Sequence, residues 1–129
     1  MRDELTHRFW GKAVKVEEEK LREFYDEETR KVVEILKKAD PEKIIRFGSS
    51  VWGTLGEDSD IDLCVLKRLE DGSVREKQRL RRLLSRYGYA YPVDIELHIY
   101  SPEEYEERLG KGNLFLREIE RGEVIYARG

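Results

Sequence analysis

The alternation of apolar and polar side chains at positions 93–100 is the feature that most limits how this chain can fold. This segment, VDIELHIY, places its apolar residues at every second position, which is typical of a strand with one buried face. Two shorter apolar segments, KIIRF at 43–47 and DIDLCVL at 60–66, also predict strands. A weaker apolar run at 124–127 predicts a short terminal strand.

Segments with helical periodicity separate these strands. Residues 4–25 predict an amphipathic helix, and Asp26 either caps a second helix or marks a bend in one long helix. Further helices are expected at a brief segment ending near Leu55, at 73–87, from Ser101-Pro102 to Leu109, and from Asn113 to Gly122. The pattern predicts an α+β fold, a small mixed β-sheet with helices packed on it. We expect a helical extension at 1–25 and a globular domain at 26–129.

Composition narrows the class of protein. Of the 129 residues, 41% are charged, yet the net charge is only −3, so a surface made wholly for nucleic acid is not expected. The single cysteine excludes an internal disulfide and fits a reducing compartment. The N-terminal MRDELTHRFW lacks the apolar core of a secretory signal, and no apolar run could span a membrane. We therefore expect a cytoplasmic protein, and its dense mixed charge suggests the hypothesis of a thermophilic source.

The basic residues between Lys67 and Arg86 leave a role for RNA open, although a solvated helix face is the simpler interpretation.

Gly48-Ser49 and Asp60-Ile61-Asp62 are the residues most suggestive of chemistry. A glycine after a strand permits a sharp turn, and a following helix start presents N–H groups that suit a phosphate. Residues two apart on a strand share a face, so Asp60 and Asp62 would lie together. Their oxygens suit Mg²⁺ or Mn²⁺. The plain alternative is a turn whose acids only cap local N–H groups.

A third carboxylate would complete this site. Asp94 lies near the start of the 93–100 strand, on the face opposite Val93 and Ile95. If that strand lies beside 60–66, Asp94 can approach Asp60 and Asp62. Glu96 shares its face and is the competing candidate; we favour Asp94, because its shorter side chain holds a ligand more rigidly.

Phe47-Gly48-Ser49 followed by Asp60-Ile61-Asp62 resembles the signature of the DNA polymerase beta-type nucleotidyltransferase superfamily, and the later lone carboxylate strengthens the likeness. The small size resembles the minimal nucleotidyltransferases, which are often paired with HEPN-domain proteins. The resemblance implies that 26–129 is the nucleotidyltransferase domain and that Asp60, Asp62 and Asp94 are catalytic residues holding two Mg²⁺ ions. It also implies that Gly48 and Ser49 bind the nucleotide phosphates. Ser50 departs from the pattern, since many relatives carry a basic residue there.

By this resemblance we expect Mg²⁺-dependent transfer of a nucleoside monophosphate, AMP from ATP, to an acceptor hydroxyl. A tyrosine of a HEPN-domain toxin is the acceptor we favour, which would make the chain an antitoxin. The alternative is a non-catalytic binding module that neutralises a partner by occlusion. The N-terminal helix is expected to mediate homo-oligomerisation.

Several other residues have ordinary structural interpretations. Cys64 is expected to be a small buried residue, and neither His7 nor His98 has metal-ligand spacing. Trp52 could stack on a base or pack against the sheet. Tyr105 lies among glutamates, in what the sequence suggests is an exposed helix.

Overall fold

The computed structural model describes the backbone of residues 2–52 and 59–129, with side chains from residue 17 onward except that of Trp52. Its elements, in chain order, are α1 (Arg2–Leu36), η1 (Lys37–Ala39), β1 (Lys43–Phe47), α2 (Ser49–Trp52), β2 (Ile61–Leu66), α3 (Ser73–Arg86), β3 (Ile95–Tyr100), α4 (Pro102–Gly110), α5 (Leu114–Glu120) and β4 (Glu123–Ala127). The brief helix expected to end near Leu55 corresponds to α2, and the expected residues after Trp52 lie outside the described residues.

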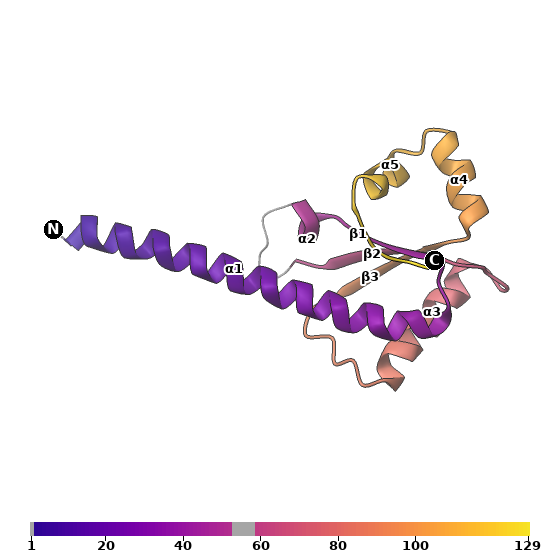
Figure 1. Ribbon diagram of the computed structural model, residues 1–129, viewed down its shortest axis with the longest axis horizontal. Helices are drawn as coiled ribbons and strands as arrows, with labels where there is room; N and C mark the ends of the chain where they lie inside the picture. The colour runs from indigo at the N-terminus through magenta and orange to yellow at the C-terminus, as the bar shows by residue number, and fades with distance from the viewer. Residues whose placement is uncertain (1, 53–58) are drawn as a thin grey trace.

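The four strands form one mixed sheet in the order β3-β2-β1-β4. Strand β1 is antiparallel to both β2 and β4, whereas β2 and β3 are parallel. A parallel pair needs a crossover connection, and α3 provides it between β2 and β3 (Figure 1). This arrangement confirms the α+β fold with a small mixed sheet.

Helices cover both faces of the sheet (Figure 1). On one face, α1 and α3 pack on the side chains that alternate along β2 and β3, and together they form the larger core: Val32, Leu36, Ile61, Leu63, Val65, Leu80, Leu84, Ile95, Leu97 and Ile99. On the other face, α4 and α5 enclose a smaller core of Ile45, Phe47, Cys64, Leu66, Tyr105, Leu116 and Ile119. Asp62 lies two residues before Cys64 on β2, so it belongs to this second face.

Helix α1 is continuous through residue 26, so Asp26 is not an N-cap and the two expected helical segments form one long helix. The physical reason is Tyr25, which is only 1% exposed and packs in the larger core with Val32 and Leu36. A buried side chain at this point favours continuing the helix rather than breaking it. The helix ends where expected, because Asp40, before Pro41, adopts a left-handed conformation with φ of 57°.

Two strand boundaries differ from the prediction. Strands β2 and β3 begin at Ile61 and Ile95 rather than at 60 and 93. The backbone N–H of Ile61 donates a hydrogen bond of 2.9 Å to the Asp94 carbonyl, so regular pairing starts there. Asp60 and Asp94 therefore lie directly before their strands.

Tyr105 is buried rather than exposed, with 4% of its surface accessible. Its hydroxyl donates a hydrogen bond of 2.8 Å to Oε2 of Glu120 and links α4 to α5.

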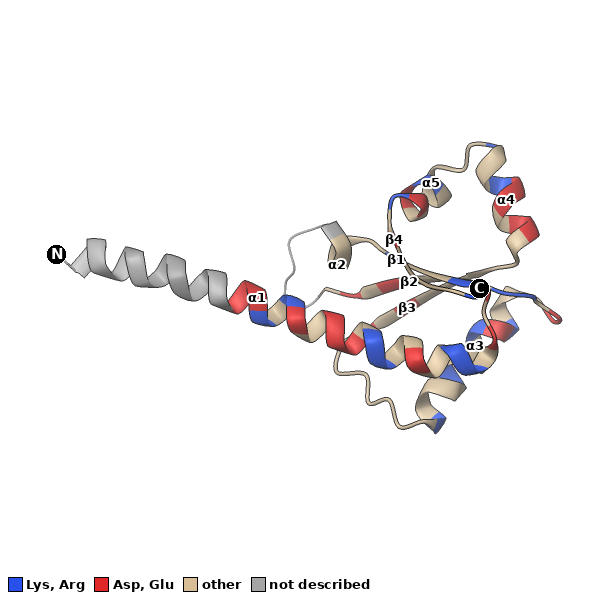
Figure 2. Cartoon of the chain, viewed as in Figure 1, with Lys and Arg blue, Asp and Glu red and all other residues tan. Residues whose placement is uncertain are grey.

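Acidic and basic residues are interspersed along α4 and along the coloured part of α1 (Figure 2). Several are paired one turn apart, as in Lys31–Glu28, Lys37–Glu34 and Arg108–Glu104. Among the described residues, no helix combines the length and the apolar composition needed to cross a membrane.

Candidate active site

The parallel register of β2 and β3 brings the predicted acidic residues to the same end of the sheet. Ile61 pairs with Ile95 and Asp62 with Glu96, so Asp60 and Asp94 lie next to each other one position earlier. Since side chains alternate along a strand, Asp62 and Glu96 emerge on the face that α4 and α5 cover, and Asp60 and Asp94 lie directly before the two strands.

The acidic residues affect one another electrostatically. Partial burial raises the pKa of the Asp60 carboxyl above its ordinary value, and repulsion by Asp94, Asp62 and Glu96 raises that pKa further. Among the three carboxylates, Asp94 has the largest effect on the pKa of Asp60, followed by Asp62 and Glu96. Glu96, the competing candidate, therefore belongs to the same cluster as Asp94.

Gly48 brings the turn after β1 against Asp62. Phe47 pairs with Asp62 across the antiparallel β1–β2 ladder, and Gly48 has a φ of +82° that disfavours other residues. A Cβ at position 48 would lie 2.5 Å from Oδ2 of Asp62. Only glycine therefore fits this close approach of backbone and carboxylate.

The predicted phosphate-binding turn at Gly48-Ser49, here called the phosphate turn, continues into α2, which begins at Ser49. The backbone N–H of Val51 donates a hydrogen bond of 3.0 Å to the Gly48 carbonyl. The structure thus places Gly48 against Asp62 and Ser49 directly after it, at the start of α2.

Ser50, which replaces a basic residue, is fully buried. Its Oγ accepts a hydrogen bond of 3.1 Å from Nε of Arg46, and Nη1 of Arg46 donates one of 2.7 Å to Asp26. Ser50 therefore stabilises the turn through its hydrogen bond to Arg46. The positive charge next to its hydroxyl is the Arg46 guanidinium, which comes from β1.

His98 lies near the site, although the sequence analysis gave it no functional role. Its Nε2 lies 3.6 Å from Oδ1 of Asp62, and its ring centroid is 5.2 Å from those of both Phe47 and Phe115. Alternation along β3 indicated that it shares a face with Glu96, but the contact with Phe115 depends on the packing of α5. The side chains of Trp52 and His7 lie outside the described residues.

The donor chemistry of the cluster fits Mg²⁺, although the side chains do not form a ready-made cage. Asp60, Asp62 and Asp94 offer only hard oxygen ligands, and a cation would relieve the repulsion that raises the pKa of Asp60. Among the side chains that the structure describes, those of residues 17–51 and 59–129, no three of His, Cys, Asp or Glu are arranged to hold a metal ion. Coordination would therefore require these carboxylates to turn toward one another.

Comparison with known proteins agrees with this geometry. The family described as "Nucleotidyltransferase domain" matches residues 29–126, and the chain belongs to this family. It is a minimal nucleotidyltransferase, with the mixed sheet and acidic strand ends that the sequence predicted.

A relative with a related name also supports membership of the nucleotidyltransferase family. Over 73 residues the chain is 33% identical to the "putative protein adenylyltransferase" of Methanocaldococcus jannaschii, an alignment covering 57% of this chain and 73% of the relative. The residues before Thr29 lie outside the family match.

Proposed function

We propose that this nucleotidyltransferase transfers AMP from ATP to a hydroxyl group of a protein, with Mg²⁺ as its cofactor. The observation that carries the proposal is the position of Asp60, Asp62 and Asp94 beside the Gly48 turn, where Asp60 is subject to the charge of the other two. The choice of AMP and of a protein acceptor is supported by the printed name of the relative, a protein adenylyltransferase.

Each residue has a distinct role in this proposal. Gly48 and Ser49 bind the terminal phosphates through backbone N–H groups, and the missing Cβ of Gly48 lets this turn lie against the Asp62 carboxylate. Asp60 and Asp62 would hold the two metal ions, and Asp94 would be an additional ligand of the ion nearer the acceptor. Two Mg²⁺ ions, when bound, supply charge neutralisation at the attacking and leaving oxygens.

The reaction is a single displacement at the α-phosphorus. A bond forms between the acceptor oxygen and this phosphorus, and the bond to the bridging oxygen of pyrophosphate breaks. No nucleophilic side chain is needed. This agrees with Cys64, whose burial raises the pKa of its thiol to about 12 and makes it a poor nucleophile.

We further propose that the acceptor is a tyrosine of a HEPN-domain toxin and that the chain acts as its antitoxin. This step rests on the resemblance to minimal nucleotidyltransferases. Homo-oligomerisation through the N-terminal helix is part of the same proposal.

The test is label transfer from ATP. Purified chain, Mg²⁺ and the candidate partner are incubated with ATP labelled at either the α- or the γ-phosphate. Label from the α-position alone should appear on the partner. Asp62→Asn should abolish labelling, and the matched control Glu106→Gln, at an exposed carboxylate of α4, should retain it. Labelling that persists in Asp62→Asn would contradict the proposal.

A non-catalytic binding module is the second candidate. It is favoured by buried Ser50, which offers no positive charge to a triphosphate. In that case the chain would neutralise its partner in a stoichiometric complex, and Asp62→Asn would neutralise it as well as the wild type does.

A further inference from the structure

Residues of α1 that precede the family match contact both described ends of the connection between β1 and β2. The hydroxyl of Tyr25 donates a hydrogen bond of 2.7 Å to the carbonyl of Ser59. At the other end, Nη1 of Arg22 donates to the Ser50 carbonyl at 3.4 Å, and Asp26 binds the Arg46 guanidinium that contacts Ser50. Ser59 directly precedes Asp60, and Ser50 directly follows Ser49.

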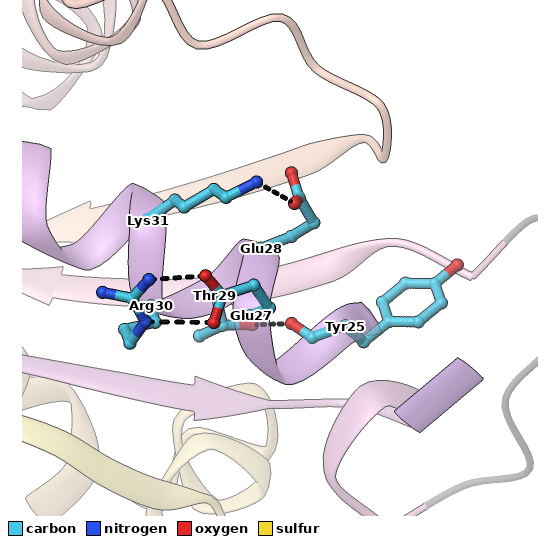
Figure 3. Close-up of polar contacts among 6 residues, drawn as sticks. All are labelled: Tyr25, Glu27, Glu28, Thr29, Arg30 and Lys31. Atoms are coloured by element: carbon cyan, nitrogen blue, oxygen red, sulfur yellow. Dashed lines mark hydrogen bonds and ion pairs between the residues drawn. The ribbon is translucent and has the colours of Figure 1, made fainter. Parts of the chain in front are cut away.

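The Tyr25 contact is rigidly supported. Its side chain is 1% exposed, and its backbone carbonyl accepts a hydrogen bond of 2.7 Å from Oγ1 of Thr29 one turn later. Figure 3 shows the ring extending from α1 toward the segment that precedes β2, away from the surface ion pairs of Arg30 and Lys31. Its hydroxyl therefore fixes the backbone immediately before the acidic cluster.

The Arg46 contact involves a buried charge. Arg46 is 6% exposed, and burying a guanidinium is unfavourable unless its donors are paired. Two of its nitrogens bind Ser50 and Asp26, while Nη2 has no hydrogen-bond partner among the residues that the structure describes. An apolar residue would be buried at this position at a lower free-energy cost than Arg46. We therefore attribute the presence of Arg46 to its contact with the turn that carries Gly48 and Ser49.

We propose that Tyr25 and Asp26 are positioning residues of the nucleotidyl-transfer site, acting with Arg46 as a clamp from α1. Tyr25 holds the backbone that presents Asp60, and the Asp26–Arg46 pair holds the turn that presents Ser49. The site in this chain thus depends on residues outside the matched 29–126 region. This inference rests on the proposed function. The helix that carries the clamp extends beyond the body of the molecule (Figure 1), so the clamp lies at the base of this extension.

The two ends of the clamp should affect different kinetic constants. In Tyr25→Phe the ring remains and only the hydroxyl is lost, and we expect kcat for AMP transfer to fall about tenfold with KM for ATP within twofold. In Asp26→Asn we expect KM for ATP to rise about fivefold with kcat within twofold, since Ser49 meets the bound nucleotide.

Tyr105→Phe is the matched control. It also removes a buried tyrosine hydroxyl, one that binds Glu120 between α4 and α5, and it should lower stability without changing kcat or KM. If Tyr25→Phe and Tyr105→Phe lose stability alike and neither changes a kinetic constant, the clamp is only structural and the inference is wrong.

Amide hydrogen exchange tests the clamp without any activity. The N–H of Ile61, bonded to the Asp94 carbonyl, should exchange about tenfold faster in Tyr25→Phe, relative to amides further along β2. It should be unchanged in Tyr105→Phe. A wild-type chain inactive with every nucleotide would refute the proposed function but leave this measurement valid. Unchanged exchange at Ile61 in Tyr25→Phe would overturn the clamp itself.

Discussion

Replacing Gly48 with alanine tests whether the backbone at Gly48 lies as close to the Asp62 carboxylate as the proposed site requires. Two costs arise in Gly48→Ala. The φ of +82° would be forced on a residue with a Cβ, at about 1–2 kcal/mol. The new Cβ would also lie 2.5 Å from Oδ2 of Asp62, and overpacking of this kind costs roughly 1–3 kcal/mol. We therefore expect Gly48→Ala to lower the free energy of unfolding by about 2–5 kcal/mol.

Gly88→Ala separates these two costs. Gly88 has a similar φ of +78°, but a Cβ there would meet nothing within 4 Å. Its replacement should cost only the conformational part, about 1–2 kcal/mol. Alanine also restricts the unfolded chain at both positions, and this smaller effect cancels between the two variants. Urea unfolding, followed by circular dichroism, measures both costs.

A double-mutant cycle then identifies the clashing partner. In an Asp62→Ala background the carboxylate is absent, so Gly48→Ala should cost about 1–3 kcal/mol less than in the wild type and should match Gly88→Ala. An equal cost of Gly48→Ala in both backgrounds would refute the close approach of Gly48 and Asp62, and with it the geometry assigned to the phosphate turn.

Three further predictions concern charge, reactivity and heat. Because the pKa of Asp60 is raised above 3.8 in the folded state, the folded state binds a proton more readily than the unfolded state, and ionising Asp60 opposes folding. With metal chelated, Asp60→Asn should therefore melt at a higher temperature than the wild type at pH 7, and this difference should disappear well below pH 3.8; no difference at pH 7 would contradict the repulsion. Buried Cys64, with its thiol pKa of about 12, should not react with a disulfide reagent at pH 8 until denaturant is added, and rapid native labelling would show that it is accessible. The hypothesis of a thermophilic source predicts a Tm above the range of about 45–65 °C typical of mesophilic domains, and scanning calorimetry showing a Tm within that range would end it.

Local patterns predicted the strands and the acidic cluster well. Alternation at 93–100 defines which side chains share a face, and the spacing of Asp60 and Asp62 places both on one side of the next strand. Their meeting with Asp94 required only that the two strands be neighbours, and the parallel register confirms it.

Features that depend on long-range packing could not be predicted in this way. Tyr105 lies among four glutamates, so the local composition predicted an exposed helix. The burial of Tyr105 in the smaller core depends on packing against the sheet. Tyr25 lies where the sequence suggested a possible helix boundary, and its burial depends on the larger core that α1 forms with the rest of the chain. The Ser50–Arg46 contact joins a turn to the strand before it, and a short serine gives no sequence signal of such a partner.

The most direct test of the account is the rate of pyrophosphate release from ATP in four single variants of the cluster. Asp60→Asn, Asp62→Asn and Asp94→Asn should each lower kcat by about a thousandfold or more, as expected for groups that stabilise the transition state. Glu96→Gln, at the competing carboxylate on the same face, should retain kcat within a few-fold of the wild type. A fully active Asp94→Asn together with an inactive Glu96→Gln would contradict the assignment of the third acidic residue, and full activity in Asp62→Asn would contradict the site as a whole.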